Sequence, residues 1–140
     1  MEACIFCALV DGRIPARKVF EDEAHVAFLP LKHINPGHTL LVPRRHDESL
    51  FAMDDAAYHA IFAVAKRLAP PVQRVSEAKR VGLLVEGFSV PHVHVHLVPV
   101  NALGDIDPAR ERAVADAEAD RLAQRLREAI AAAGAAGELR

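Results

Sequence analysis

The 140-residue sequence is poor in cysteine and in aromatic residues: it has two cysteines, no tryptophan, and 5% Phe, Trp and Tyr together. Two cysteines cannot build the disulfide framework that staples small secreted domains. The sequence also lacks an apolar run of the ~18 residues that a membrane span needs, and it does not open with a basic segment followed by an apolar core. These absences predict a cytoplasmic protein without a membrane partner.

Neither sign of charge dominates, since 17 Lys and Arg oppose 19 Asp and Glu, and no stretch is basic enough to follow a nucleic-acid backbone. We therefore expect no nucleic-acid polymer as a partner. A small anionic ligand stays open, because a few backbone amides can hold one phosphate. With 51% apolar residues, the length fits one globular domain over residues 1–140.

Hydrophobic periodicity and turn residues predict a mixture of helices and strands. Helical spacing predicts a short turn over residues 4–10, a core helix from Asp54 to Pro70-Pro71, and a long amphipathic C-terminal helix over about residues 107–134. Alternating or β-branched runs predict strands, of which the first two form a hairpin and the last two pair, at residues 18–21, 24–29, 38–42, 81–86 and 92–100.

The most informative segment is His92-Val93-His94-Val95-His96, with a histidine at every second position. On a strand, the three imidazoles share one face and the valines face the core. Three titratable rings in a row gain nothing as packing, whereas a neutral imidazole is a nucleophile and a proton carrier near pH 7. The pattern indicates a chemical site, with a plain metal-binding strand as the alternative.

Cys4 and Cys7 offer half of a metal site, because zinc takes four nitrogen or sulfur ligands. With a rise of about 3.3 Å per residue, His92 and His96 start roughly 13 Å apart, so one ion cannot take both ends of the histidine row. His92 and His46 are the candidates that complete the site. The alternative for the cysteine pair is two buried thiols on a helical turn.

His94, in the middle of the row, then stays unligated. One of its ring nitrogens could attack an electrophilic phosphorus, and the P–N bond that forms is labile enough for water to resolve it. Gly87 and Ser89 precede the strand, where backbone amides and a hydroxyl could stabilise phosphoryl oxygens.

Residues 92–98 resemble the histidine triad (HIT) signature, His-φ-His-φ-His-φ-φ, in which φ is apolar. The resemblance covers roughly residues 4–100. It extends upstream, in order, to Cys4-Ile5-Phe6-Cys7, Ile14-Pro15-Ala16, Phe20-Glu21-Asp22, Ala27-Phe28-Leu29 and the segment 35–46.

The resemblance implies an α+β fold with an antiparallel sheet of about five strands, a core helix and a long C-terminal helix. It further implies a homodimer that hydrolyses or transfers nucleoside monophosphate groups through a nucleotidyl-histidine intermediate. The implied substrate is a purine nucleotide that is cleaved at its α-phosphate, such as a phosphoramidate or a dinucleoside polyphosphate.

Roles follow from the resemblance for individual residues. His94 is similar to the nucleophile, His96 to the residue that contacts the phosphate and assists the leaving group, His38 to a supporting histidine, and Ser89 to a serine near the scissile bridge. The implied structural zinc site is Cys4, Cys7, His46 and His92. The implied apolar walls of the purine pocket are Ile5, Phe6, Leu9, Ile14, Phe28 and Leu31. The family pattern leaves His25, His33 and His59 as surface or packing residues.

Two positions depart from the family pattern. Pro30 stands where the family commonly has an Asp that holds the ribose hydroxyls, and Phe88 replaces an amide donor in the loop before the triad. Two other functions therefore stay open. One is a nucleotide-binding or zinc-stabilised interaction module without turnover, and the other is a metallohydrolase whose zinc is held by His92, His94 and another ligand.

Overall fold

The structure of this chain, a computed structural model, describes residues 4–135, with side chains to residue 134. Its helices are α1 (Ile5–Val10), α2 (Asp55–Ser76) and α3 (Asp116–Ala135), with 3-10 turns η1 (Leu50–Ala52) and η2 (Pro108–Arg110). Its strands are β1 (Arg17–Glu21), β2 (His25–Leu29), β3 (Lys32–His33), β4 (Thr39–Pro43), β5 (Arg80–Leu84), β6 (Val95–Val100) and β7 (Arg112–Ala113).

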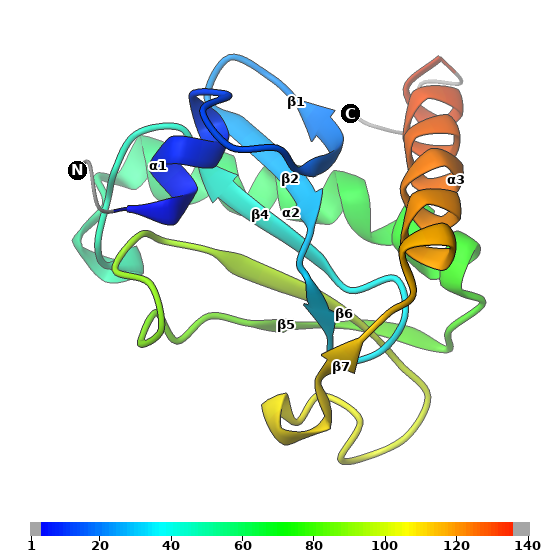
Figure 1. The fold of residues 1–140 in the computed structure, drawn as a ribbon. Helices are drawn as coiled ribbons and strands as arrows, with labels where there is room; N and C mark the ends of the chain where they lie inside the picture. The colour runs from blue at the N-terminus through cyan, green and yellow to red at the C-terminus, as the bar shows by residue number, and fades with distance from the viewer. Residues whose placement is uncertain (1–3, 136–140) are drawn as a thin grey trace.

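Five strands form one antiparallel sheet in the order β1-β2-β4-β6-β5, and β3 pairs with β7 in a separate two-stranded ribbon. Helix α2 lies behind the sheet in Figure 1, and α3 lies beside it against β1. The predicted α+β fold with a five-stranded antiparallel sheet, a core helix and a long C-terminal helix is confirmed.

Side-chain alternation on the central strands supplies two separate cores. On β2, Ala27 and Leu29 join the cluster beneath α2 and α3, whereas Val26 and Phe28 join a second cluster beneath α1. All residues of β2 and β4 are buried, because helices cover both faces of the sheet at these strands. The residues that face α1 form the floor on which the candidate site is built.

The segment after β6 covers the α1-side face of the sheet farther along. Ile106 packs on β5 at Gly82, where an added Cβ would lie 2.7 Å from the Ile106 Cδ1 atom. A side chain at position 82 would therefore displace this segment. None of the helices in residues 4–135 is long and apolar enough to cross a membrane.

The prediction that α2 ends at Pro70-Pro71 is wrong, since the helix continues to Ser76 and ends at Glu77 in the left-handed conformation, φ 56°. A proline removes one helical hydrogen bond and clashes with the preceding turn. Burial offsets that cost here, because Val72 and Val75 extend the apolar face of α2 into the core.

The prediction of a C-terminal helix over residues 107–134 is wrong at its start, because α3 begins at Asp116. Asp107 does cap a turn, but the turn is the 3-10 segment Pro108–Arg110. The chain then extends, and Arg112 pairs with His33 in the β3–β7 ribbon. Pairing with a distant strand thus replaces the first predicted turns of the helix.

The last predicted strand also begins later, at Val95 rather than at His92. The first two residues of the predicted strand donate their amide hydrogens outside the sheet. The His92 amide donates to the Val90 carbonyl, and the Val93 amide donates to the Asp47 carbonyl. The alternation still holds, because Val93, Val95 and Leu97 all lie in the core beneath α2.

We expect Pro70→Ala to raise the free energy of unfolding by about 1–3 kcal/mol, because alanine restores a helical N–H at an exposed position within α2. Urea unfolding measures the difference. Pro108→Ala is the matched control: this proline occupies the first position of η2, where no N–H is required, so its loss should lower or preserve stability. An unchanged or lower stability of Pro70→Ala would contradict the prediction.

Candidate active site and metal site

Three imidazoles lie together on the α1-side face of the sheet. His94 and His96 have ring centroids 5.1 Å apart, and His38 lies 5.1 Å from His96 on the other side. His94 is buried, with 3% of its surface exposed, while His96 is half-buried. The structure thus brings together the three histidines that the sequence singled out around the proposed nucleophile.

The hydrogen bond of His94 determines which ring nitrogen is free. Its Nδ1 atom lies 2.8 Å from the main-chain carbonyl oxygen of His92. A carbonyl oxygen only accepts, so Nδ1 bears the hydrogen and donates it. In the neutral ring the lone pair then resides on Nε2, which is the atom available for nucleophilic attack.

A second chain of hydrogen bonds sets the tautomers of His38 and His96. The Ile34 amide donates to Nδ1 of His38 at 2.9 Å, so the hydrogen of this ring is on Nε2. That Nε2–H donates to Nδ1 of His96, also at 2.9 Å. The remaining hydrogen of neutral His96 is therefore on its Nε2 atom.

Burial keeps this pair neutral. Burial, with smaller contributions from the rings of His96 and His33, lowers the pKa of His38 from 6.5 to about 3. Burial and the neighbouring His94 lower the pKa of His96 to about 4. At neutral pH, His96 is thus a fixed, uncharged hydrogen-bond donor.

The turn before β4 places His38. Residues 35–38 form a type II β-turn, with Pro36 at its second position, Gly37 at φ 98°, and the His38 amide donating to the Asn35 carbonyl. The Asn35 side-chain amide donates to the carbonyls of Pro99 and Asp105, each at 2.8 Å. Asn35 therefore fastens the turn to the end of β6 and to the segment that follows it.

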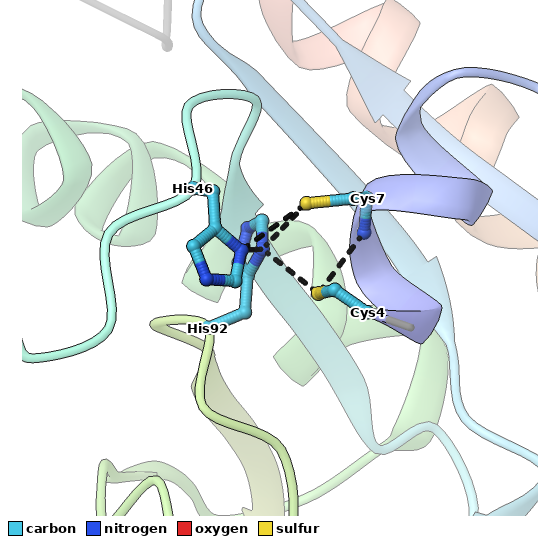
Figure 2. A group of neighbouring side chains, drawn as sticks. All are labelled: Cys4, Cys7, His46 and His92. Carbon is cyan, nitrogen blue, oxygen red and sulfur yellow. Dashed lines mark hydrogen bonds between the residues drawn. The ribbon is translucent and has the colours of Figure 1, made fainter. Parts of the chain in front are cut away.

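A second cluster consists of Cys4, Cys7, His46 and His92, whose ligand atoms all lie within 4.8 Å of one another. Figure 2 shows both thiols of the α1 region directed toward the two imidazoles. Nδ1 of His92 lies 3.4 Å from Sγ of Cys4, 3.5 Å from Sγ of Cys7 and 3.2 Å from Nδ1 of His46. These four residues lie close enough to bind one metal ion.

The donor set fits zinc. In a tetrahedral zinc site with usual bond lengths, neighbouring ligand atoms lie roughly 3.3–3.8 Å apart, close to the separations seen here. Nε2 of His92 donates to the Pro43 carbonyl at 2.8 Å, which leaves the Nδ1 lone pair facing the thiols. Burial raises the pKa of Cys7, so a thiolate at this position requires a cation to offset its desolvation.

The metal cluster and the nucleophile share two connections. His92 contributes its ring to the cluster and its carbonyl oxygen to His94. Phe6, which lies between the two cysteines on α1, contacts the His92 and His94 rings edge-on, with centroids 5.8 and 5.0 Å away. The group of ligand atoms does not include His94, so the geometry disfavours a metallohydrolase that binds its ion through His92 and His94.

The remaining predicted site residues differ in their surroundings. Three of the predicted pocket walls are buried in the second core: Phe6, Leu9 and Phe28. Ile14 packs against that core from its edge, whereas Ile5 and Leu31 are exposed. Ser89 is exposed on the loop between β5 and His92 and makes no hydrogen bond to the three histidines.

Two residues that support the site, Asn35 and His33, were not predicted from the sequence as functional residues. Asn35 is not among the predicted site residues, and its Oδ1 atom also accepts from Arg110 at 3.0 Å. His33, predicted as a surface or packing residue, is buried beside His38, with ring centroids 6.2 Å apart. Two histidines five positions apart around a Pro-Gly turn were the available signal.

The model of the HIT domain family matches residues 11–103. The chain is 34% identical over 111 residues to the protein named "Protein hit" of Bacillus subtilis, which covers 74% of this chain and 75% of that protein. It is similar to the crystal structure of a zinc-bound histidine triad family protein from Mycobacterium smegmatis, with a TM-score of 0.84, 26% identity, and coverage of 96% and 98%. It is also similar to a HIT family hydrolase from Legionella pneumophila, with a TM-score of 0.59, 28% identity, and coverage of 68% and 90%.

The low pKa of His38 predicts a specific loss of stability in acid. Between pH 6.5 and about 3 the unfolded chain binds a proton at this residue that the folded protein does not, so stability falls as pH falls through this window. We expect His38→Asn to reduce the slope by up to about 1.4 kcal/mol per pH unit. Urea unfolding at pH 7, 6, 5 and 4 measures it, with His59→Asn as the control for losing an imidazole. Equal slopes for wild type and His38→Asn would contradict the prediction.

Proposed function

Because this chain belongs to the HIT domain family, we propose that it is a nucleotide hydrolase or nucleotidyltransferase whose nucleophile is His94. One observation carries the proposal: Nδ1 of His94 donates to the His92 carbonyl, so that the Nε2 lone pair is free beside His96. An imidazole held in this tautomer needs no base to become nucleophilic.

The proposed reaction has two displacements at the α-phosphate of a nucleotide. In the first, Nε2 of His94 forms a bond to phosphorus, and the bond from phosphorus to the leaving group breaks with its electron pair going to the leaving group. In the second, water or another acceptor attacks the same phosphorus and loses its proton. The P–N bond then breaks, which releases the nucleoside monophosphate and regenerates neutral His94.

His96 assists by donating a hydrogen bond rather than by titrating. Its Nε2–H is fixed by the bond from His38 to its other nitrogen, and its low pKa keeps the ring neutral at physiological pH. A fixed neutral donor stabilises charge on the phosphoryl or leaving oxygen without a cost in reorganisation. We propose that the hydroxyl of Ser89, on its exposed loop, donates a hydrogen bond to the same oxygens.

The proposed substrate is a purine nucleotide, as a phosphoramidate, a dinucleoside polyphosphate or a similar compound. Exposed Ile5 and Leu31, with Ile14 at the edge of the second core, offer apolar surface for the base. Phe6, Leu9 and Phe28 support that surface from within the core. We further propose, as the family resemblance implies, that the protein works as a cytoplasmic homodimer.

We propose that Cys4, Cys7, His46 and His92 hold one zinc ion with a structural role. Bound zinc would supply stability by cross-linking α1 to the segments that carry His46 and His92. The chain's own residues supply the chemistry: His92 orients His94 through its carbonyl, and Phe6 packs against both rings.

The low exposure of His94 favours one alternative, a nucleotide-binding or zinc-stabilised module without turnover. A substrate has little surface by which to reach a ring that is 3% exposed. The covalent intermediate distinguishes the two functions, because a binding module forms none.

Protein quenched during incubation with adenosine phosphoramidate or diadenosine polyphosphate should gain the mass of one nucleoside monophosphate, located on His94 by fragmentation. His94→Ala should lose the adduct and lower the rate of nucleotide cleavage on the order of 10³-fold or more, with the metal content and the fold unchanged. His59→Asn, on the exposed face of α2, is the control for losing a histidine. Nucleotide cleavage by His94→Ala at the wild-type rate would contradict the mechanism. Nucleotide binding without any covalent adduct in the wild type would favour the binding module.

Metal removal tests the zinc proposal without reference to activity. The purified protein should contain about one zinc ion per chain, and Cys7→Ser or a chelator should remove it. The loss should lower the Tm on the order of 10 °C, because a bound ion stabilises only the folded state. His59→Asn should retain both the metal and the Tm. A zinc-free wild type, or a Cys7→Ser protein that keeps its zinc, would contradict the proposal.

A further inference from the structure

His33 is buried and lies directly behind the candidate site. Its side chain is 1% exposed, and its backbone pairs with Arg112 in the β3–β7 ribbon. Nδ1 of His33 accepts a hydrogen bond from the Gly37 amide at 3.3 Å. The hydrogen of the neutral ring is therefore on Nε2.

His33 and His38 lie on either side of the same turn, and each ring accepts a hydrogen bond from a main-chain amide near the opposite end of the turn. The Gly37 amide donates to His33, and the Ile34 amide donates to His38 at 2.9 Å. Each ring thus accepts an amide four residues away, one at each end of the segment 34–37. Both inward-facing amides of the turn are satisfied by imidazoles and not by strand partners.

The arrangement has a cost. Nε2 of His33 is buried without a hydrogen-bond partner among the described residues. Burial lowers the pKa of His33, and a weak interaction with the Pro30 carbonyl opposes this fall without meeting the geometry of a full hydrogen bond. A buried donor without a full hydrogen bond lowers stability, a loss that an aliphatic side chain would avoid. A role for the lone pair on Nδ1 accounts for an imidazole at this position.

We propose that His33 is a positioning residue for the reaction at His94: it holds the Gly37 amide, and so keeps the Ile34 amide directed at Nδ1 of His38. This inference rests on the proposed function for its effect on rate, but the effect on the tautomer of His38 stands independently of it.

The path from His33 to the reacting atoms runs through three hydrogen bonds. Without an acceptor at residue 33, the Gly37 amide is buried and unpaired, and the turn rearranges to satisfy it. The Ile34 amide then leaves Nδ1 of His38, which frees that ring to carry its hydrogen on either nitrogen. His96 consequently loses the donor that fixes its own hydrogen on Nε2.

Asn35 holds the same turn through its hydrogen bonds to the carbonyls of Pro99 and Asp105, so Asn35 and His33 have different roles. Asn35 sets the place of the turn relative to β6. His33 sets the direction of the amides within it. A change at His33 should therefore alter the ring tautomers without detaching the turn from the sheet.

The test compares His33→Asn with His33→Leu in the metal-loaded full chain. The Asn Oδ1 atom can occupy the place of the His Nδ1 atom and accept from Gly37, whereas Leu fills the space without an acceptor. Ring ¹⁵N NMR of His38 and His96 should show the wild-type tautomers in His33→Asn and a mixture in His33→Leu. With a nucleotide substrate, His33→Leu should lower kcat about 10- to 100-fold with KM little changed, and His33→Asn should restore it.

His25→Leu is the matched control, because His25 is also buried, at 5% exposure, but bonds to Asp22 away from the three histidines. It should change stability without changing the tautomers or kcat. Wild-type tautomers in a folded His33→Leu protein would overturn the proposal, even if its Tm falls. If His33→Leu does not fold, His33→Gln replaces it in the comparison. The extra methylene of Gln moves the side-chain amide oxygen away from the position of the His Nδ1 atom, so a mixture of tautomers is again expected. Absence of any nucleotide cleavage in the wild type would contradict the proposed function and leave the tautomer result decisive for His33.

Discussion

The hydrogen bond from Nδ1 of His94 to the carbonyl oxygen of His92 is the contact on which the rest of the site depends. His92 and His94 are two residues apart in the segment that precedes the strand ladder of β6. The carbonyl of His92 is thus free of a strand partner and available to the imidazole. One main-chain acceptor thereby determines which nitrogen of the nucleophile carries a lone pair.

The sheet needs cover on both faces to sustain this arrangement. Helices α2 and α3 bury the face that carries Val93, Val95 and Leu97, and α1 buries part of the opposite face. His38 and His96 are desolvated by burial on the opposite face, which explains why their pKa values fall well below 6.5. Packing and electrostatics are therefore linked in this fold, since the burial of His38 and His96 also keeps these two imidazoles uncharged.

Local patterns in the sequence were sufficient for the five main strands and for the histidine row, because alternation and turn chemistry act over a few residues. The antiparallel sheet was implied by the resemblance to the HIT family. The four residues of the metal cluster were also predicted, since Cys4 and Cys7 needed two imidazoles, and His46 and His92 were the candidates that the resemblance to the HIT family implied. Contacts between distant segments were not predictable. The start of α3 depends on pairing between Arg112 and His33, and the roles of Asn35 and His33 depend on partners that no local spacing specifies.

The metal cluster joins parts of the chain that are far apart in sequence. Cys4 and His92 are separated by 88 positions, and Cys7 and His46 by 39. Closing such long loops carries an entropic cost, so a cross-link between these residues removes more conformational entropy from the unfolded chain than a cross-link between near neighbours would. A metal ion bound by all four side chains would therefore act as a long-range cross-link, which stabilises the folded chain by restricting the unfolded one.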